Sequence, residues 1–339
     1  MRFEEFVPLA PFTTFQIGGP ARWFVQATTE KEIAEGVEFA HECGLPFFVL
    51  GGGSNLLVRD SGFPGLVIYV CLKGIDQKGD CFEVAAGESW DAFVSYAVER
   101  NYAGIECLAG IPGTVGATPV QNVGAYGQEV AETIVCLRAW DTKTSKVVEL
   151  AAADCGFAYR QSIFNAAARG RYIVTSVTYR LRAAGEPNLG YADLRRRFPA
   201  GSKPALKDVS EAVREIRHGK GMLIVEGEPD CRSAGSFFKN PVVDTADYAR
   251  IASQSTGPVP SYPTGEGRVK LAAAWLVEQA GFPRGYTMGR AGISSRHTLA
   301  LINRGGATAE DVLALAGRIR AKVREQFGIE LAMEPVVLE

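Results

Sequence analysis

The spacing of apolar and polar positions outlines the elements expected in the N-terminal part of the chain. Short apolar runs predict strands over 22–27, 46–50 and 65–70, with a helix over 30–43 between the first two. Thr29 and Glu32 have capping-box spacing, and Gly44 is placed to end this helix. The expected order is therefore strand, helix, strand, glycine-rich loop and strand.

Residues 72–183 show period-two alternation or short apolar runs, which are typical of strands. One helix is expected over 91–100, with Ser89 as its cap. Strands are predicted at Cys81–Ala86, Ile134–Trp140, Val147–Leu150 and Tyr172–Leu181. Strands that outnumber helices in this way indicate an α+β domain with a mixed or antiparallel sheet.

The C-terminal third begins after a polar, Pro- and Gly-rich segment at 184–207, which is predicted to be a boundary or a mobile loop. The remaining pattern is mainly helical, and its final residues alternate like a strand. The expected elements are a helix over 209–217, a buried apolar helix over 269–280, a helix that Thr308 and Asp311 open and Gly328 ends, and a strand over 329–338.

Composition narrows the class of protein without identifying it. The 339 residues carry 36 Lys and Arg against 38 Asp and Glu, a near-neutral balance that argues against a nucleic-acid-binding face. Because the first ten residues lack a signal-peptide pattern and no run of 18 apolar residues occurs, we expect a cytoplasmic protein without membrane spans. Seven scattered cysteines and three histidines have no metal-ligand spacing, so neither a disulfide framework nor a metal site is expected.

Glycine is the compositional outlier, and two segments concentrate it. Residues 51–55 read GGGSN, and six of the 38 glycines fall within 104–127. Such backbone can donate N–H groups to phosphates without obstruction by side chains, although tight turns at strand ends would explain the first loop equally well. The spacing is not that of a Rossmann loop, and the Walker lysine is absent. A dinucleotide cofactor therefore fits better than ATP hydrolysis.

Five motifs, in order along nearly the whole chain, resemble the UDP-N-acetylenolpyruvoylglucosamine reductase family, in its form with a tyrosine loop and a split substrate domain. They are Gly51–Asn55, Gly110–Ala117, Gln121–Gly127 (QNVGAYG), Tyr159–Phe164 (YRQSIF) and Ala234–Pro241 (AGSFFKNP). A glutamate near the C-terminus completes the pattern. Each motif alone is weak, but the ordered set is specific.

This resemblance implies an α+β protein with an FAD-binding fold of the p-cresol methylhydroxylase and vanillyl-alcohol oxidase (PCMH/VAO) type. Its two α+β subdomains would span 1–71 and 72–207, with the FAD region at about 18–183. A third α+β domain at 208–328 would bind substrate, and 329–339 would return to the active site. The implied cofactor is non-covalent FAD, reduced by NADPH, and the implied product is UDP-N-acetylmuramate, a peptidoglycan precursor.

The resemblance also places the family's catalytic trio at Arg160, Ser236 and Glu334, and the chemistry suits these residue types. A guanidinium stabilises charge that builds on a substrate carboxylate, and a hydroxyl held in reach can protonate the adjacent carbanion. A glutamate with a raised pKa would protonate or polarise the intermediate. Each residue also has a purely structural alternative. Arg160 could form a buried salt bridge, Ser236 could belong to a turn or helix cap, and Glu334 could be a solvated carboxylate on a strand. Glu330 is a second spacing for the acid; the family's count favours Glu334.

Further residues carry over by position. The cofactor loops would contribute Gly51, Gly52, Gly53, Ser54, Asn55, Gly113, Thr114, Gly116, Ala117, Gln121, Asn122, Gly124 and Ala125. Substrate contacts would come from Tyr126, Tyr191, Lys220, Asn240, Lys270 and His297, although a lone histidine or an exposed lysine is often purely structural or solvated. The register of Lys220 is open because residues 219–231 depart from the family's shorter versions.

Two other classes of function compete with this hypothesis. A flavin oxidase or lactone dehydrogenase could use the same fold, but many of these tether FAD through a histidine near the first glycine loop, and 51–70 contains none. A nucleotide-binding module without catalysis would be free to lose the trio, and all three residues are present. We therefore expect a bacterial, monomeric reductase that acts on small molecules and binds neither nucleic acid nor membranes.

Overall fold

The computed structural model describes residues 1–265 and 267–339, and these divide into two compact units. Unit 1 comprises 1–7, 21–53 and 63–219, and unit 2 comprises 8–20, 54–62 and 220–339. Unit 1 contains all of 72–207 and most of 1–71, whereas 8–20 and 54–62 belong to unit 2. The domain limits expected at 71 and 207 stay predictions.

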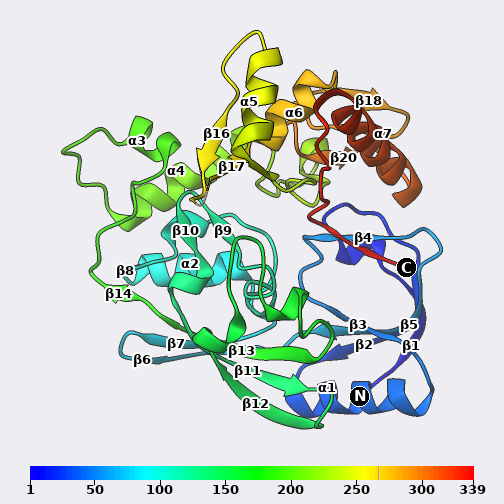
Figure 1. Ribbon diagram of the computed structural model, residues 1–339. Helices are drawn as coiled ribbons and strands as arrows, with labels where there is room; N and C mark the ends of the chain where they lie inside the picture. The colour runs from blue at the N-terminus through cyan, green and yellow to red at the C-terminus, as the bar shows by residue number, and fades with distance from the viewer. Residues whose placement is uncertain (266) are drawn as a thin grey trace. The chain divides into compact units, whose positions relative to one another are not determined.

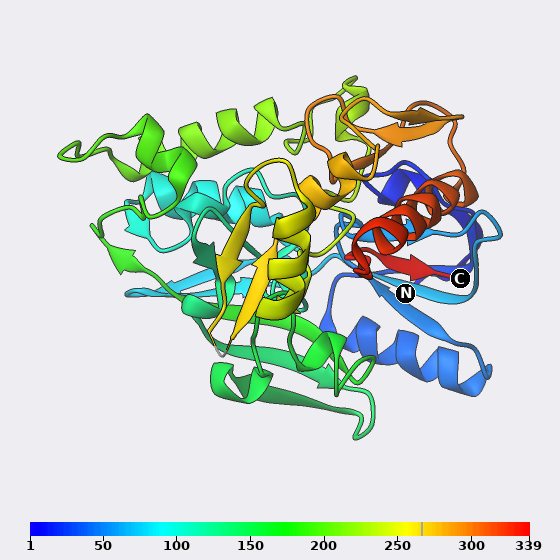
Figure 2. The same ribbon diagram turned by 45° about the horizontal axis from the view of Figure 1, so that its top comes forward.

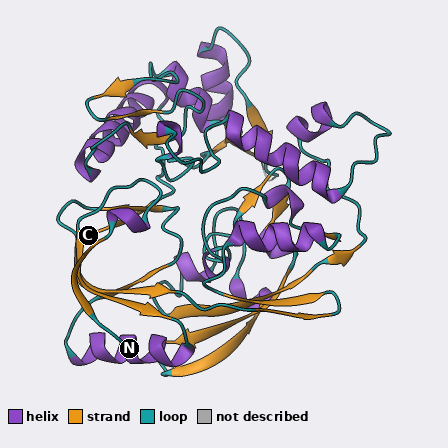
Figure 3. Ribbon diagram, turned by 180° about the vertical axis from the view of Figure 1, so that it is seen from behind, coloured by secondary structure: helices purple, strands orange, loops and turns teal. Residues whose placement is uncertain are grey.

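The first sheet of unit 1 has the strand order β1-β2-β5-β3, and β2, β5 and β3 run parallel. Its strands are β1 (Glu4–Pro8), β2 (Pro20–Ala27), β3 (Phe47–Leu50) and β5 (Phe63–Val70). Helix α1 (Glu30–Glu42) lies along this sheet and buries Ile33, Val37 and Ala40 (Figures 1 and 3). The capping box at Thr29 and Glu32 is present, which confirms the expected start of the helix.

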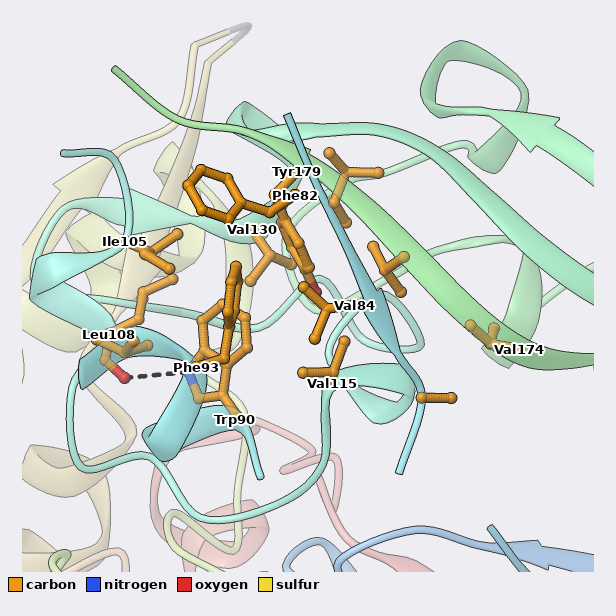
Figure 4. Close-up of a cluster of buried hydrophobic side chains, with 14 of the residues drawn as sticks. Phe82, Val84, Trp90, Phe93, Ile105, Leu108, Val115, Val130, Val174 and Tyr179 are labelled. Atoms are coloured by element: carbon orange, nitrogen blue, oxygen red, sulfur yellow. Dashed lines mark hydrogen bonds between the residues drawn. The ribbon is translucent and has the colours of Figure 1, made fainter. Parts of the chain in front are cut away.

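The second sheet of unit 1 is antiparallel throughout, with the order β12-β11-β13-β7-β6. Its strands are β6 (Ile75–Lys78), β7 (Cys81–Ala85), β11 (Ile134–Asp141), β12 (Lys146–Ala151) and β13 (Tyr172–Arg180). Helix α2 (Trp90–Glu99), capped by Ser89, packs Trp90 and Phe93 against Tyr179 of β13 (Figure 4). The Trp90 indole N–H donates to the Leu108 carbonyl, which ties the following loop to this core.

The remaining elements of unit 1 are short strand pairs and two helices. Strands β8 (Tyr102–Ala103) and β14 (Arg182–Ala183) pair with each other, as do β9 (Gly124–Ala125) and β10 (Gln128–Glu129). Helix α3 (Ala192–Arg197) precedes α4 (Leu206–Gly219), which packs against α2. The polar segment 184–207 therefore contains one short helix.

Unit 2 combines three small sheets with three helices. The sheets are β15-β17-β16 (Val242–Asp244, Arg268–Leu271, Ser261–Pro263), β18-β19-β20 (Thr287–Met288, Ala291–Ile293, Leu301–Asn303) and the parallel pair β4 (Leu56–Val58) and β21 (Val336–Leu338). The helices are α5 (Thr245–Gln254), α6 (Ala273–Gln279) and α7 (Ala309–Phe327). Figure 2 shows α7 and β21, which belong to the C-terminal part of the chain.

Two expectations for unit 2 were wrong in extent. The apolar stretch 269–280 is not one helix, because Arg268–Leu271 pairs with β15 and β16 as a strand and α6 begins only at Ala273. In the tail, only Val336–Leu338 is a strand. The capping box of Thr308 and Asp311 and the left-handed Gly328 confirm the limits of α7.

All seven cysteines are free thiols, and no helix among the described residues is long and apolar enough for a membrane span.

Candidate functional site

The two glycine-rich loops of unit 1 lie backbone against backbone. A Cβ atom added to Gly52 would stand 2.5 Å from the Gly113 Cα, and one added to Gly51 would stand 2.7 Å from the Thr114 Oγ1. The contact at 52 is with backbone, so a side chain there would push the loops apart, whereas one at 51 would displace the Thr114 side chain. The glycines are therefore required by a close approach of the two loops.

Free backbone donors accompany this approach and allow a test of whether a dinucleotide fits. Within residues 1–265 and 267–339, the N–H groups of Gly51, Gly52 and Gly53 have no hydrogen-bond partner. Gly116, in contrast, donates its N–H to the Ala86 carbonyl at 2.9 Å, so the second loop is fixed to the sheet. Bare amides on one loop and a rigid wall on the other suit a pyrophosphate.

The segment after the second loop forms a tight hairpin with a strained tip. Strands β9 and β10 enclose the two-residue turn Tyr126–Gly127, and both residues have positive φ, 49° and 82°. This backbone is costly for tyrosine, so surrounding contacts must hold it. The Tyr126 ring packs edge-on against Tyr191 at a centroid distance of 5.3 Å. Two residues expected on the substrate side therefore lie together within unit 1.

Asn122, which precedes this hairpin, is buried and forms three side-chain hydrogen bonds. Its Nδ2 donates to the Glu129 carboxylate at 2.7 Å and to the Ala158 carbonyl at 3.2 Å, and its Oδ1 accepts from the Ala131 N–H at 3.1 Å. Because both the nitrogen and the oxygen of its amide bond to protein groups, the Asn122 side chain stabilises the conformation of this loop. Gln121 precedes it, Ala125 lies in β9, and Ala117 ends the short 3₁₀ turn that begins at Val115.

Arg160 lies in a tight turn between Ala158 and Gln161 and has a φ of 54°, which is uncommon for a residue with a side chain. Its guanidinium donates to the Gly124 carbonyl at 2.7 Å and to the Asn122 carbonyl at 3.4 Å. A planar guanidinium has five donors in a fixed fork, so these two bonds orient the group. The backbone strain and the fork together aim Arg160 at the hairpin loop.

Ser236 and Glu334 belong to unit 2, where one short strand pairing brings their segments together. Phe238 pairs with Met333, and the Glu334 N–H donates to the Phe237 carbonyl at 2.9 Å. Phe237 and Phe238 are buried, whereas Ser236 is half-buried and follows Gly235, which has a φ of 69° and open space around its Cα. Ser236 is therefore a partly accessible residue that directly precedes two buried aromatic residues.

Asn55, expected on the cofactor side, also fixes the segment of Glu334. Its Nδ2 donates to the Glu334 carbonyl at 3.2 Å, and its own carbonyl accepts from the Val336 N–H at 3.0 Å. The two candidate acids lie in different surroundings. Glu330 is exposed and pairs with Arg320 on α7, while Glu334 lies in the pairing beside the Ser236 segment. The assignment of Glu334 as the acid stays a prediction.

The other expected substrate residues of unit 2 have varied surroundings. The Asn240 Oδ1 accepts from the Ala273 N–H at 2.9 Å, so this side chain caps α6, and the Lys270 ammonium lies 5.8 Å from the Tyr262 ring centroid. His297 is largely buried, and burial together with the nearby Lys220 charge lowers its pKa to about 4. Its Nδ1 accepts from the Leu299 N–H at 3.2 Å, so the ring is neutral near pH 7 and its Nε2 carries the proton.

One residue of this region was missed at the sequence level. Arg217 on α4 is buried, donates its Nε–H to the Gly110 carbonyl at 3.0 Å and hydrogen-bonds the Tyr126 side chain. Burial lowers the pKa of its guanidinium. The signal was available, because Arg217 follows Val209 and Val213 at four-residue spacing on the apolar face of α4.

Comparison with known proteins identifies first the class and then the family. A family described as "FAD binding domain" matches residues 21–151, which span the first glycine loop and most of the second sheet. This assigns the chain to the flavin-dependent oxidoreductases, and it confirms the expected α+β fold with an FAD-binding domain. A second family, described as "UDP-N-acetylenolpyruvoylglucosamine reductase, C-terminal domain", matches residues 228–338.

Relatives of similar length support the same assignment. UDP-N-acetylenolpyruvoylglucosamine reductases of Streptomyces coelicolor and Thermobifida fusca are each 46% identical to this chain, over 98% and 99% of it and over 89% and 98% of their own lengths. The crystal structure of the reductase from Thermus caldophilus matches with a TM-score of 0.72 and 28% identity, over 100% of both chains. The chain belongs to the UDP-N-acetylenolpyruvoylglucosamine reductase family, as its motifs predicted.

A substitution of Gly52 tests the flavin assignment of the loops. Gly52→Ala should lose most of its bound FAD, because the new Cβ would stand 2.5 Å from Gly113 and force the loops apart. Gly317→Ala in α7 is a matched control, since no atom lies within 4 Å of its added Cβ, and it should keep the flavin and gain up to ~1 kcal/mol of stability. The measurement is the flavin-to-protein absorbance ratio after desalting. Equal ratios in both variants would exclude Gly52 from the cofactor site.

Proposed function

We propose that this protein catalyses the NADPH-dependent, FAD-mediated reduction of UDP-N-acetyl-3-O-(1-carboxyvinyl)glucosamine to UDP-N-acetylmuramate, a step of peptidoglycan precursor synthesis. The observation that carries the proposal is the match to reductases of this name over 98% of the chain, with Arg160, Ser236 and Glu334 all present. The chemistry that FAD would supply when bound is hydride transfer from NADPH to the β-carbon of the enolpyruvyl double bond. The residues of this chain supply the remaining requirements.

Arg160 would bind the carboxylate of the enolpyruvyl group. When the β-carbon gains a hydride, negative charge develops on the α-carbon and spreads into that carboxylate. A guanidinium stays protonated and binds both carboxylate oxygens in one plane, so it stabilises this charge as it forms. The bonds from Arg160 to the carbonyls of Gly124 and Asn122 would hold the fork in place before substrate arrives.

Ser236 would donate the proton that the α-carbon needs. A hydroxyl is a weak acid, but a carbanion is a strong base, so a hydroxyl within reach is sufficient. The buried Phe237 and Phe238 rings next to it would limit competing water. Glu334 would protonate or polarise the same intermediate. The C=C bond takes up one hydride, which comes from NADPH, and one proton, and becomes a saturated lactyl ether. Ser236 then regains a proton from solvent, and NADPH leaves as NADP⁺.

The substrate side would be formed by Tyr126, Tyr191, Lys220, Asn240, Lys270 and His297. Lysine ammonium groups suit the diphosphate, and a neutral His297 can donate its Nε2 proton to a hydroxyl or phosphate oxygen. The backbone N–H groups of Gly51, Gly52 and Gly53 would hold the FAD pyrophosphate, and no metal is required. A monomeric state and a cytoplasmic location stay predictions.

One anaerobic experiment tests the reaction. The purified protein should show a flavin absorption band that bleaches when NADPH is added and returns when UDP-N-acetylglucosamine enolpyruvate follows. UDP-N-acetylglucosamine, which lacks the enolpyruvyl double bond and so cannot accept electrons, should not restore it. A band that NADPH bleaches and the enolpyruvyl substrate leaves bleached would refute the proposed substrate, and a failure of NADPH to bleach it would refute the proposed donor.

A further inference from the structure

A buried carboxylate that the proposed mechanism does not use lies beside the second glycine loop. Glu106 is 0% exposed, and its Oε2 accepts from the Gly104 N–H at 2.7 Å. Its Oε1 accepts from the Gln128 Nε2 and from the Asn188 N–H, both at 2.8 Å. Throughout residues 1–265 and 267–339, Glu106 forms no salt bridge. All three of its strong partners are neutral donors.

Burial of a carboxylate without a paired cation costs free energy of solvation. Its hydrogen bonds must therefore have short distances and favourable geometry to offset this cost. An ionised acceptor makes shorter and stronger bonds to N–H groups than a neutral one. The charge of Glu106 also acts on its surroundings, since it contributes to the raised pKa values of the Cys107 thiol and the Glu132 carboxyl, for which burial is the larger cause. Glu106 is therefore a strong, directed acceptor at the centre of this region.

Its partner Asn188 forms hydrogen bonds through both its backbone and its side chain. The Asn188 N–H donates to Glu106, and its carbonyl accepts from the Cys107 Sγ at 3.3 Å. Its Nδ2 donates to the Gly127 carbonyl at 2.9 Å, and its Oδ1 accepts from the Gly190 N–H at 2.8 Å. The same Gln128 that donates to Glu106 also accepts from the Cys107 N–H at 2.8 Å.

These bonds connect two segments that carry the facing tyrosines. Gly127 and Gln128 adjoin Tyr126, and Asn188 and Gly190 lead directly into Tyr191. Tyr191 itself is 40% exposed, so its own burial cannot account for its place against the nearly buried Tyr126 ring. The hydrogen bonds at Asn188 attach the segment that leads into this ring to Glu106 and to the hairpin residue Gly127.

We propose that Glu106 is a positioning residue: with Asn188 as its partner it fastens the start of the segment 188–191 to the hairpin Gly124–Glu129 and so holds Tyr191 against Tyr126. The proposal that this attachment sets substrate affinity rests on the proposed function, in which both tyrosines contact substrate. The attachment itself is independent of the reaction. Loss of Glu106 or Asn188 releases the tyrosine segment and leaves the close approach of Gly52 to Gly113 in place.

Limited trypsin digestion of the full chain tests the attachment, because α3 presents the exposed Arg195, Arg196 and Arg197 directly after Tyr191. Asn188→Ala removes two side-chain bonds from a half-buried loop residue and should raise the initial cleavage rate at these arginines about tenfold. Glu106→Gln should raise it similarly, and the double variant should add little more. Mass spectrometry of the first fragments locates the cut.

Glu30→Gln is the matched control. Glu30 is another carboxylate of unit 1, and it joins α1 to the second sheet through Arg138 and Thr175. Its loss should lower stability but leave cleavage in α3 unchanged. Wild-type cleavage rates in both Asn188→Ala and Glu106→Gln would overturn the proposal, as would an acceleration in Glu30→Gln of the same size. Asn188→Ala keeps the test decisive if Glu106→Gln fails to fold.

Steady-state kinetics then test the positioning role. Both variants should raise the KM for UDP-N-acetylglucosamine enolpyruvate about tenfold with little change in kcat, and flavin reduction by NADPH should proceed as in wild type. Faster cleavage with an unchanged KM would overturn the positioning role. If the wild-type protein does not turn over this substrate, the proposed function fails, and the digestion still decides whether Glu106 and Asn188 hold the segment.

Discussion

Ser236→Ala is expected to separate the two halves of the reaction. FAD should bind and NADPH should reduce it at the wild-type rate. The substitution leaves the proposed cofactor loops, Gly51–Gly53 and Gly113–Gly116, unchanged. Product formation should fall by about 10²–10⁴-fold, the range associated with loss of a positioned proton donor. Stopped-flow absorbance follows the reduction by NADPH, and a second mixing step with the enolpyruvyl substrate follows reoxidation.

Two further variants identify the hydroxyl as the cause. Ser236→Cys keeps a proton donor at the same position and should recover part of the lost rate. Ser233→Ala removes another buried hydroxyl of this segment, which accepts from the Gly235 N–H at 3.3 Å, and should lower the rate by less than about tenfold. Reoxidation in Ser236→Ala at the wild-type rate would rule out the proton-donor role.

Local signals predicted the fold where they were strong. Capping boxes at Thr29 and Thr308 confirmed two helix starts, and period-two runs predicted the strands of the antiparallel sheet. The stretch 269–280 was mistaken for one helix because its apolar residues suit either structure. Pairing of Val269 with Val243 decided for a strand, and that partner lies 26 residues away. Long-range pairing of this kind leaves no local pattern.

The sequence predicted which residues belong to the candidate site. It did not predict their backbone conformations or their contacts. Motifs named Arg160, Tyr126 and Asn122, but no spacing indicates that Arg160 and Tyr126 adopt positive φ or that Asn122 is fully engaged by protein partners. The same holds for Glu106, whose neutral partners come from distant positions such as Asn188. Buried polar networks depend on tertiary structure, so a single sequence shows their members without showing their connections.

Arg160→Lys should lose about 10²–10³-fold in kcat/KM for the enolpyruvyl substrate, the cost of removing a donor aimed at developing charge. Lysine keeps the positive charge, but a single ammonium cannot bond the carbonyls of Gly124 and Asn122 and also bind a carboxylate with two parallel bonds. The loss should appear mainly in kcat, because the interaction strengthens as charge forms on the α-carbon. Steady-state kinetics at several concentrations of the enolpyruvyl substrate measure both parameters.

The competing explanation for such a loss is collapse of the hairpin, since Arg160 also holds the loop of Gly124. Flavin content and thermal stability separate the two: a reactive role predicts that Arg160→Lys keeps its FAD and its flavin reduction by NADPH, whereas collapse predicts that both are lost. Arg180→Lys, at an exposed arginine of β13, controls for the change of residue type and should retain wild-type kinetics. Unchanged kcat/KM in Arg160→Lys would remove this residue from the reaction, because a fork that lysine can replace is not binding a carboxylate in two places.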